Sequence, residues 1–180
     1  MSHPTQPGET SSHPGKIKPP LSDTLQMITR FTIERVGRQN SADFLFLLTE
    51  LAQYEDIVPP DAETGSRLVR DILLYPPPFE AYIGRSDGQP VGCVSFFMTY
   101  STFLARSTLF IEDLFVRSDY RGHGFGRALF SFCRNEARAR GCGRMEWMVL
   151  SWNKPSIRFY EKVGGRKIGW DVYRLEEEEM

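Results

Sequence analysis

Hydrophobic and polar positions alternate in two different periods along the chain. Period-two alternation over Phe31–Val36 predicts a first strand. Apolar residues at helical spacing predict a helix from an N-cap at Ser41 to about Glu55, and another over 62–74. The same patterns predict further elements: strands over 79–83, 91–100, 108–116 and 144–150, helices over 126–140 and 153–163, and a final strand over Trp170–Leu175.

This order, β-α-α-β-β-β-α-β-α-β, predicts an α/β fold with a mixed central sheet flanked by helices. Residues 1–24 are rich in Pro, Ser and Thr and offer few side chains to bury, so we expect a disordered tail. Residues 25–180 are then expected to form a single domain.

Composition excludes several classes of protein. The net charge of −1 lacks the basic excess of a nucleic-acid binder, and no apolar run is long enough to span a membrane. Only His123 lies in the expected domain, and the three cysteines are scattered, so no metal site is expected. An odd cysteine count with no signal peptide indicates a cytoplasmic protein.

A glycine-rich loop between a buried strand and a helix is the sharpest local motif. Its seven residues are Arg121, Gly122, His123, Gly124, Phe125, Gly126 and Arg127. Glycines let the backbone approach a ligand, and a helix start supplies unpaired N–H groups, so the loop predicts a site for a pyrophosphate. It lacks the Lys-Ser/Thr of a P-loop, and its spacing fits a dinucleotide fingerprint poorly.

The spacing Arg121-x-x-Gly124-x-Gly126 resembles the acetyl-CoA loop of the GNAT family of N-acetyltransferases. The segment from Trp152 to Gly164 looks like the family's second cofactor segment, and the element order agrees. Together with Tyr54-Glu55 and Glu112-Asp113, these motifs are most similar to the diamine (spermidine/spermine-type) branch. The resemblance implies an acetyl-CoA-dependent transferase that acts on the primary amine of a small molecule.

Two residues are expected to be catalytic. Glu112 lies in an apolar strand, where burial should raise the pKa of its carboxyl and suit it as a base, directly or through water. Strand alternation places Asp113 on the opposite face of the sheet unless a bulge intervenes. The resemblance implies that Tyr160 lies near the cofactor sulfur, where a phenol can protonate the leaving thiolate.

The resemblance also implies two sets of binding residues. Backbone and side-chain groups are expected to hold acetyl-CoA: Leu114, Phe115 and Val116 on a splayed strand, the loop residues Arg121, Gly122, His123, Gly124, Phe125, Gly126 and Arg127, and Asn153 and Ser156. Amine-binding residues are expected to be Tyr54, Glu55, Glu112, Trp147 and Met148, the last two being equally compatible with core packing.

The identity of the amine stays open at this stage. Ser101, Phe103 and Ser151 stand where the polyamine enzymes carry acidic residues or tryptophan, so a lysine-like amine is as compatible as a polyamine. Two other functions compete with this one: acetylation of a protein or peptide amine, and non-catalytic sensing of an acyl-CoA. The resembling branch also implies a homodimer.

Overall fold

The computed structural model describes residues 31–180, so the expected tail over 1–24 lies outside the described residues. Five strands, four helices of nine residues or more and two short 3-10 turns make up the described chain. In order they are β1 Phe31–Arg35, α2 Ser41–Glu55, α3 Ala62–Ile72, β2 Glu80–Ser86, β3 Gln89–Ser101, β4 Arg106–Val116, η1 Ser118–Tyr120, α4 Phe125–Ala139, β5 Arg144–Trp147, α5 Lys154–Lys162 and η2 Glu177–Glu179.

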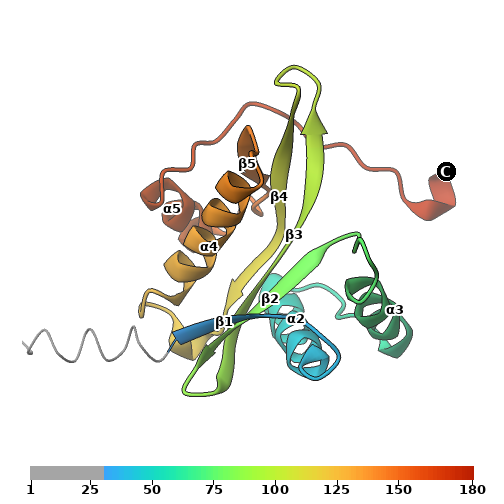
Figure 1. Cartoon of the computed structure of the whole chain (residues 1–180), viewed down its shortest axis with the longest axis vertical. Coiled ribbons are helices and arrows are strands. Elements are labelled where there is room, and N and C mark those ends of the chain that lie inside the picture. The colour runs from blue at the N-terminus through green and yellow to red at the C-terminus, as the bar shows by residue number, and fades with distance from the viewer. Residues whose placement is uncertain (1–30) are drawn as a thin grey trace, which may run out of the picture.

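The strands form one mixed sheet in the order β1-β2-β3-β4-β5. The first four strands pair antiparallel, and β5 pairs parallel to β4, as the connection through α4 requires. Figure 1 shows α2 and α3 on one side of the sheet and α4 and α5 on the other. The predicted α/β fold with a mixed, helix-flanked sheet is confirmed.

Each face of the sheet has its own core. Phe44 and Leu47 of α2 pack on Ile83, Cys93 and Phe115, and we call this the α2 face. On the α4 face, the buried side chains come from β3, β4 and α4: Val94, Phe96, Leu109, Ile111, Val116, Leu129, Phe130 and Cys133. The core to which a strand residue belongs therefore shows which side of the sheet its side chain faces.

The predicted final strand is wrong. Residues 170–175 belong to no strand or helix, and Trp170 and Tyr173 are 82% and 92% exposed. The red segment after α5 crosses the β3–β4 hairpin in the view of Figure 1 and ends away from α4 and α5. A strand needs a partner edge, and the segment pairs with none among residues 31–180.

The start of α2 also differs from the prediction. Asn40, not Ser41, is the N-cap residue, and Ser41 is the first residue of the helix. The Asn40 side chain accepts a hydrogen bond from the N–H of Gly37 and donates one to Glu34. Asn40 thus fixes the turn that joins β1 to α2.

Candidate active site

The glycine-rich loop has the backbone that an anion site requires. Gly122 and Gly124 have φ of 83° and 87°, in the left-handed region that glycine adopts without strain. Gly124 is the N-cap of α4 and has no side chain to bond the first N–H groups of the helix. These N–H groups and the positive end of the helix dipole suit a pyrophosphate, so the loop fits the predicted ligand.

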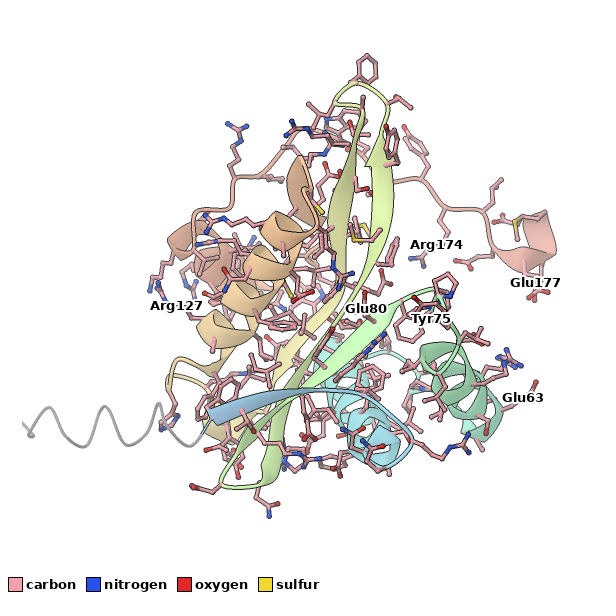
Figure 2. The ribbon with its side chains drawn as sticks, in the orientation of Figure 1. Glu63, Tyr75, Glu80, Arg127, Arg174 and Glu177 are labelled. Atoms are coloured by element: carbon pink, nitrogen blue, oxygen red, sulfur yellow. The ribbon has the colours of Figure 1, made fainter. Side chains whose placement is uncertain are left out.

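Side chains of the loop divide into buried and exposed ones. Phe125 is buried and stacks on Phe31 with ring centroids 4.7 Å apart, so only its backbone faces the loop. His123 is exposed, and its Nδ1 lies 3.0 Å from the carbonyl of Arg121. Arg127 projects outward beside the first turn of α4 (Figure 2). The exposed residues offer positive charge or hydrogen bonds to a phosphate.

The paired length of β4 and β5 is short. Pairing runs from Thr108–Arg144 to Ile111–Trp147 and stops there, while β4 continues to Val116. Backbone groups of Leu114–Val116 therefore lie beyond the end of β5. On its β5 side, β4 therefore has no strand partner among the described residues from Glu112 to Val116.

The first turn of α5 is built around Asn153. Asn153 is the buried N-cap of α5, and its Oδ1 accepts a hydrogen bond from the N–H of Ser156 at 3.2 Å. Pro155 occupies the first turn, where its missing N–H costs nothing. Asn153 has a capping role, which leaves its Nδ2 group as the part suited to a ligand.

A β-bulge changes the placement of the two acidic residues of β4. Ser95 is opposite Asp113 while Phe96 is opposite Ile111, so Glu112 is an extra residue without a partner on β3. Ile111 and Val116 face α4, whereas Phe115 faces α2. Asp113 has the same parity as Phe115, so it lies on the α2 face. Regular alternation would have put Asp113 on the α4 face with Ile111, and the bulge places it on the α2 face instead.

Three carboxyl groups, those of Asp113, Glu55 and Glu112, have raised pKa values. Burial raises the pKa of Asp113, although the Ser95 hydroxyl, which donates to its Oδ2 at 2.5 Å, opposes the rise. Desolvation and the Asp113 charge raise the pKa of Glu55 at the end of α2. The same two causes raise the pKa of Glu112. Crowded carboxylates of this kind favour a bound cation, because a positive charge relieves their repulsion.

Glu112 itself is more accessible than expected. Its side chain is exposed, because the bulge turns it out of the ladder. The expected direction of its pKa shift is confirmed, although Arg174 of the C-terminal segment lowers the pKa in part. Figure 2 shows Arg174 projecting from that segment.

Tyr160 of α5 lies in an aromatic setting and packs against the core of the α4 face. Its ring centroid is 5.1 Å from that of Trp147 and 6.2 Å from that of Phe130. Burial raises the pKa of Tyr160 to about 12, and the charges of Glu55 and Asp113 contribute to the rise. The phenol therefore keeps its proton throughout the neutral range and is available as a donor.

Other expected amine contacts have different surroundings. Trp147 packs edge-on against Phe130, which is a core contact, while Met148 is 53% exposed beyond the end of β5. Tyr54 is half-buried and contacts Arg121 and Asn153. The sequence analysis named Asp113 but did not place it among the amine-binding residues, because the bulge that sets its face has no signal in the sequence.

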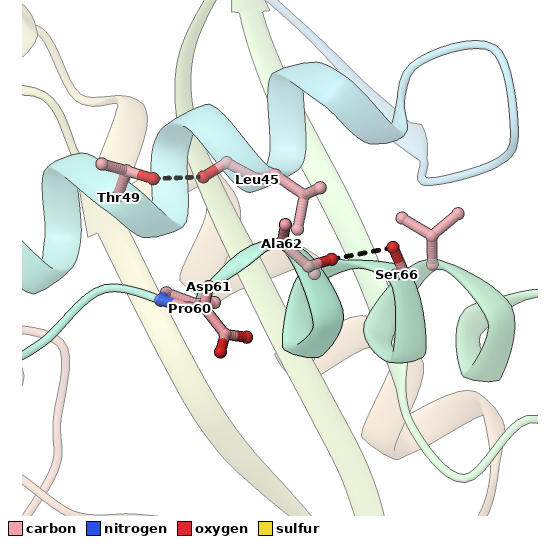
Figure 3. Close-up of a pocket in the computed structure, with 8 residues that line it drawn as sticks. Leu45, Thr49, Pro60, Asp61, Ala62 and Ser66 are labelled. Carbon is pink, nitrogen blue, oxygen red and sulfur yellow. Dashed lines mark hydrogen bonds between the residues drawn. The ribbon is translucent and has the colours of Figure 1, made fainter.

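A separate pocket of about 440 Å³ lies between α2 and α3. In Figure 3 the Thr49 hydroxyl donates to the carbonyl of Leu45, and the Ser66 hydroxyl donates to that of Ala62. These hydroxyls are bonded within their own helices, and Asp61 caps α3. The pocket therefore presents few polar groups to a ligand and contains none of the residues discussed above.

Residues 31–180 contain neither a metal-binding cluster nor a membrane-spanning helix. No group of three His, Cys, Asp or Glu residues in this part of the chain is arranged to hold a metal ion. No helix within the same range is both long and apolar enough to cross a membrane.

The described chain combines a mixed, helix-flanked sheet with a glycine-rich loop at the start of α4 and acidic side chains on β4 and at the end of α2. A sequence profile described as the Acetyltransferase (GNAT) family matches residues 45–165. The chain belongs to the GNAT acetyltransferase family.

Curated relatives include enzymes for small amines. A thialysine N-epsilon-acetyltransferase from Caenorhabditis elegans is 31% identical over 81% of this chain and 92% of its own. An L-ornithine N5-acetyltransferase from Arabidopsis thaliana is 42% identical, over 47% of this chain and 37% of that protein. A human spermidine/spermine N(1)-acetyltransferase-like protein 1 is 27% identical over 83% of this chain and 23% of its own.

Solved structures share the fold at low identity. An integron cassette protein from V. cholerae superposes with a TM-score of 0.71 at 21% identity, covering 82% of this chain and 93% of that one. An aminoglycoside N-acetyltransferase in complex with CoA has a TM-score of 0.69 at 15% identity, with coverages of 82% and 95%. These likenesses bear on the fold alone.

Proposed function

We propose that this protein transfers the acetyl group of acetyl-CoA to the primary amine of a small diamine, polyamine or lysine-like substrate. The observation that carries the proposal is the glycine-rich loop at the start of α4, which follows a strand, β4, that carries Glu112 and Asp113, in a chain of the GNAT family. Relatives named for thialysine, ornithine and spermidine/spermine support a cationic amine. A second cation on the substrate would be attracted by the carboxylates that the reacting amine does not use.

Acetyl-CoA would lie beside the end of β4 that β5 leaves unpaired, with α5 on its other side. The N–H groups at the start of α4 suit its pyrophosphate, and those of Leu114–Val116 suit its pantetheine arm and the oxygen of its thioester. Acetyl-CoA supplies an activated acyl group. The chain supplies orientation, because its donors sit on a strand and a helix that do not need to reorganise.

Proton transfer completes the reaction. An alkylamine with a pKa near ~10.4 arrives protonated, so Glu112 removes its proton, directly or through a water molecule. The amine nitrogen then forms the new C–N bond as the C–S bond breaks. Tyr160 gives its proton to the leaving thiolate, and the second proton of the amine nitrogen, which the amide product does not keep, returns through water to the phenolate. A cation held by Glu55 and Asp113 offsets the negative charges that raise the pKa of this phenol.

The test measures thiol release from acetyl-CoA with a panel of acceptors. We expect turnover with polyamines, ornithine, lysine or thialysine, and at least tenfold lower kcat/KM with amines that carry no second charge. Short peptides with free N-termini or lysine side chains serve as the comparison. Faster turnover of peptides than of any small amine would favour a protein acceptor. Tight CoA binding with no turnover of any acceptor would favour an acyl-CoA sensor.

We also propose that the protein acts in the cytoplasm as a homodimer. Its three cysteines are all unpaired, as is usual in a reducing compartment. The C-terminal segment exposes apolar side chains in a pattern typical of a strand, at Ile168, Trp170, Val172, Tyr173 and Leu175. A second copy of the chain, related by a twofold axis, could bury these exposed apolar side chains.

The oligomeric state is measured by light scattering after gel filtration. One chain weighs 20.7 kDa, and we expect about twice this mass. Trp170→Ser together with Val172→Ser should shift the mass toward one chain, because both exposed apolar side chains are lost. The paired exposed-site control, Glu177→Gln with Glu178→Gln, should not change it. A monomeric wild-type protein at micromolar concentration would contradict the proposal.

A further inference from the structure

Tyr54 is an α2 residue whose contacts lie on the cofactor side of the site. The guanidinium carbon of Arg121 lies 4.3 Å from the centroid of the Tyr54 ring. The Tyr54 hydroxyl donates to Oδ1 of Asn153 at 3.1 Å. One side chain thus connects the glycine-rich loop to the first turn of α5, although these two segments are about 30 residues apart in the sequence.

The contact with Arg121 fixes the direction of its guanidinium. Nε of Arg121 donates to the carbonyl of Val116 at 2.9 Å, and the face of the group lies over Tyr54. A long, exposed arginine would otherwise sample several rotamers. With Nε and the flat face engaged, the two terminal amino groups remain for a phosphate at the start of α4.

The contact with Asn153 fixes the N-cap of α5. Oδ1 of Asn153 accepts both the Tyr54 hydroxyl and the N–H of Ser156, so the amide cannot flip without losing both bonds. The orientation of Oδ1 therefore determines where Nδ2 points. Ring contacts with Phe115 and Trp152, with centroids 6.5 and 6.0 Å away, hold the Tyr54 ring itself.

We propose that Tyr54 is a positioning residue of the acetyl-CoA site, acting through Arg121 and Asn153, and not a contact of the amine. The proposal rests on the proposed function, because it takes Arg121 and Asn153 as cofactor-binding residues. It divides two neighbours in the sequence: Tyr54 serves the cofactor and Glu55 serves the amine. The sequence analysis had placed both with the amine.

Two substitutions separate the two contacts of Tyr54. Tyr54→Phe removes the hydrogen bond to Asn153 and keeps the ring under Arg121. Tyr54→Leu removes both. We expect the Kd for CoA, measured by calorimetry, to rise about threefold to fivefold in Tyr54→Phe and at least tenfold in Tyr54→Leu, as the loss of one and two polar contacts implies. KM for the amine should change less than twofold.

Three comparisons give the test its controls. Tyr82→Phe removes a tyrosine hydrogen bond to Glu80, away from the site, and should leave the Kd for CoA unchanged. Glu55→Gln should raise KM for the amine and leave the Kd for CoA unchanged. Tyr54→Leu added to Arg121→Ala should weaken CoA binding less than it does in the wild-type protein, since its effect passes partly through Arg121. A merely structural role would not produce this non-additivity.

The outcomes distinguish the two proposals. If Tyr54→Leu raises KM for the amine and leaves the Kd for CoA unchanged, Tyr54 is an amine contact; this inference is overturned and the proposed function stands. If Tyr54→Leu and Arg121→Ala are fully additive, the inference is also overturned. If the wild-type protein binds no CoA, the proposed function fails, and this inference fails with it.

Discussion

Tyr160→Phe is expected to lower kcat about 100-fold, the low end of the usual contribution of a general acid. The variant removes one hydroxyl and keeps the ring that packs between Trp147 and Phe130. The Kd for CoA should therefore stay within twofold of the wild-type value. The measurement is steady-state thiol release with the best amine of the panel, together with calorimetric titration of CoA.

A matched control separates this effect from the general loss of a phenol. Tyr75 is fully exposed, and Tyr75→Phe should leave kcat unchanged. An unchanged kcat in Tyr160→Phe would remove Tyr160 from the acid role and leave water as the proton donor. A fall in kcat that is matched by weaker CoA binding would instead indicate that Tyr160 positions the cofactor.

Glu112→Gln is expected to lower the rate about 100-fold at pH 7, because the protonated amine loses its base. The pKa of Glu112 is raised by desolvation and by Asp113. The carboxyl acts as a base only when it is ionised, so the wild-type rate should fall as pH drops through this raised pKa. The acidic limb of the wild-type pH–rate profile should therefore lie at a higher pH than the pKa of an ordinary glutamate.

The pH profile of Glu112→Gln should differ in shape as well as in height. Without the carboxylate, the rate depends on amine that is already neutral, so it should keep rising toward ~10.4 and approach the wild-type rate at high pH. Glu63→Gln, an exposed substitution on α3, is the control and should leave the profile unchanged. A variant whose profile runs parallel to that of the wild type would show that Glu112 is not the base. Asp113→Asn then tests the neighbouring carboxyl.

The elements that could be predicted from the sequence are those with a local signal, either a long hydrophobic pattern or a short motif. The alternation of β1, the helical stripe of α2 and the glycine loop before α4 each carry a local signal, and each lies where it was expected. The predicted strand over Trp170–Leu175 had the same alternation. Hydrophobic alternation predicts an apolar face that is stable only when it is buried, but it does not identify the element that buries it. That segment has no partner among residues 31–180.

The candidate site shows the same limit at the level of single residues. The type and position of Glu112 were sufficient to predict a carboxylate with a raised pKa on β4. The face of Asp113 was not predictable, because it depends on the register between β3 and β4, which tertiary packing determines. The orientation of Tyr54 depends on Arg121 and Asn153, which are distant in sequence.

The bulge in β4 shows how a strand can gain an acidic side chain without disturbing the core. If Glu112 is left out of the count, Ile111 and Leu114 still face α4, and Asp113 still faces α2, so the strand keeps a regular alternation. The insertion of one residue thus adds a carboxylate to β4 without moving any core side chain to the opposite face of the sheet. A one-codon insertion or deletion at this point changes the number of carboxylates on β4 in a single step, and the packed layers on both sides of the sheet are preserved.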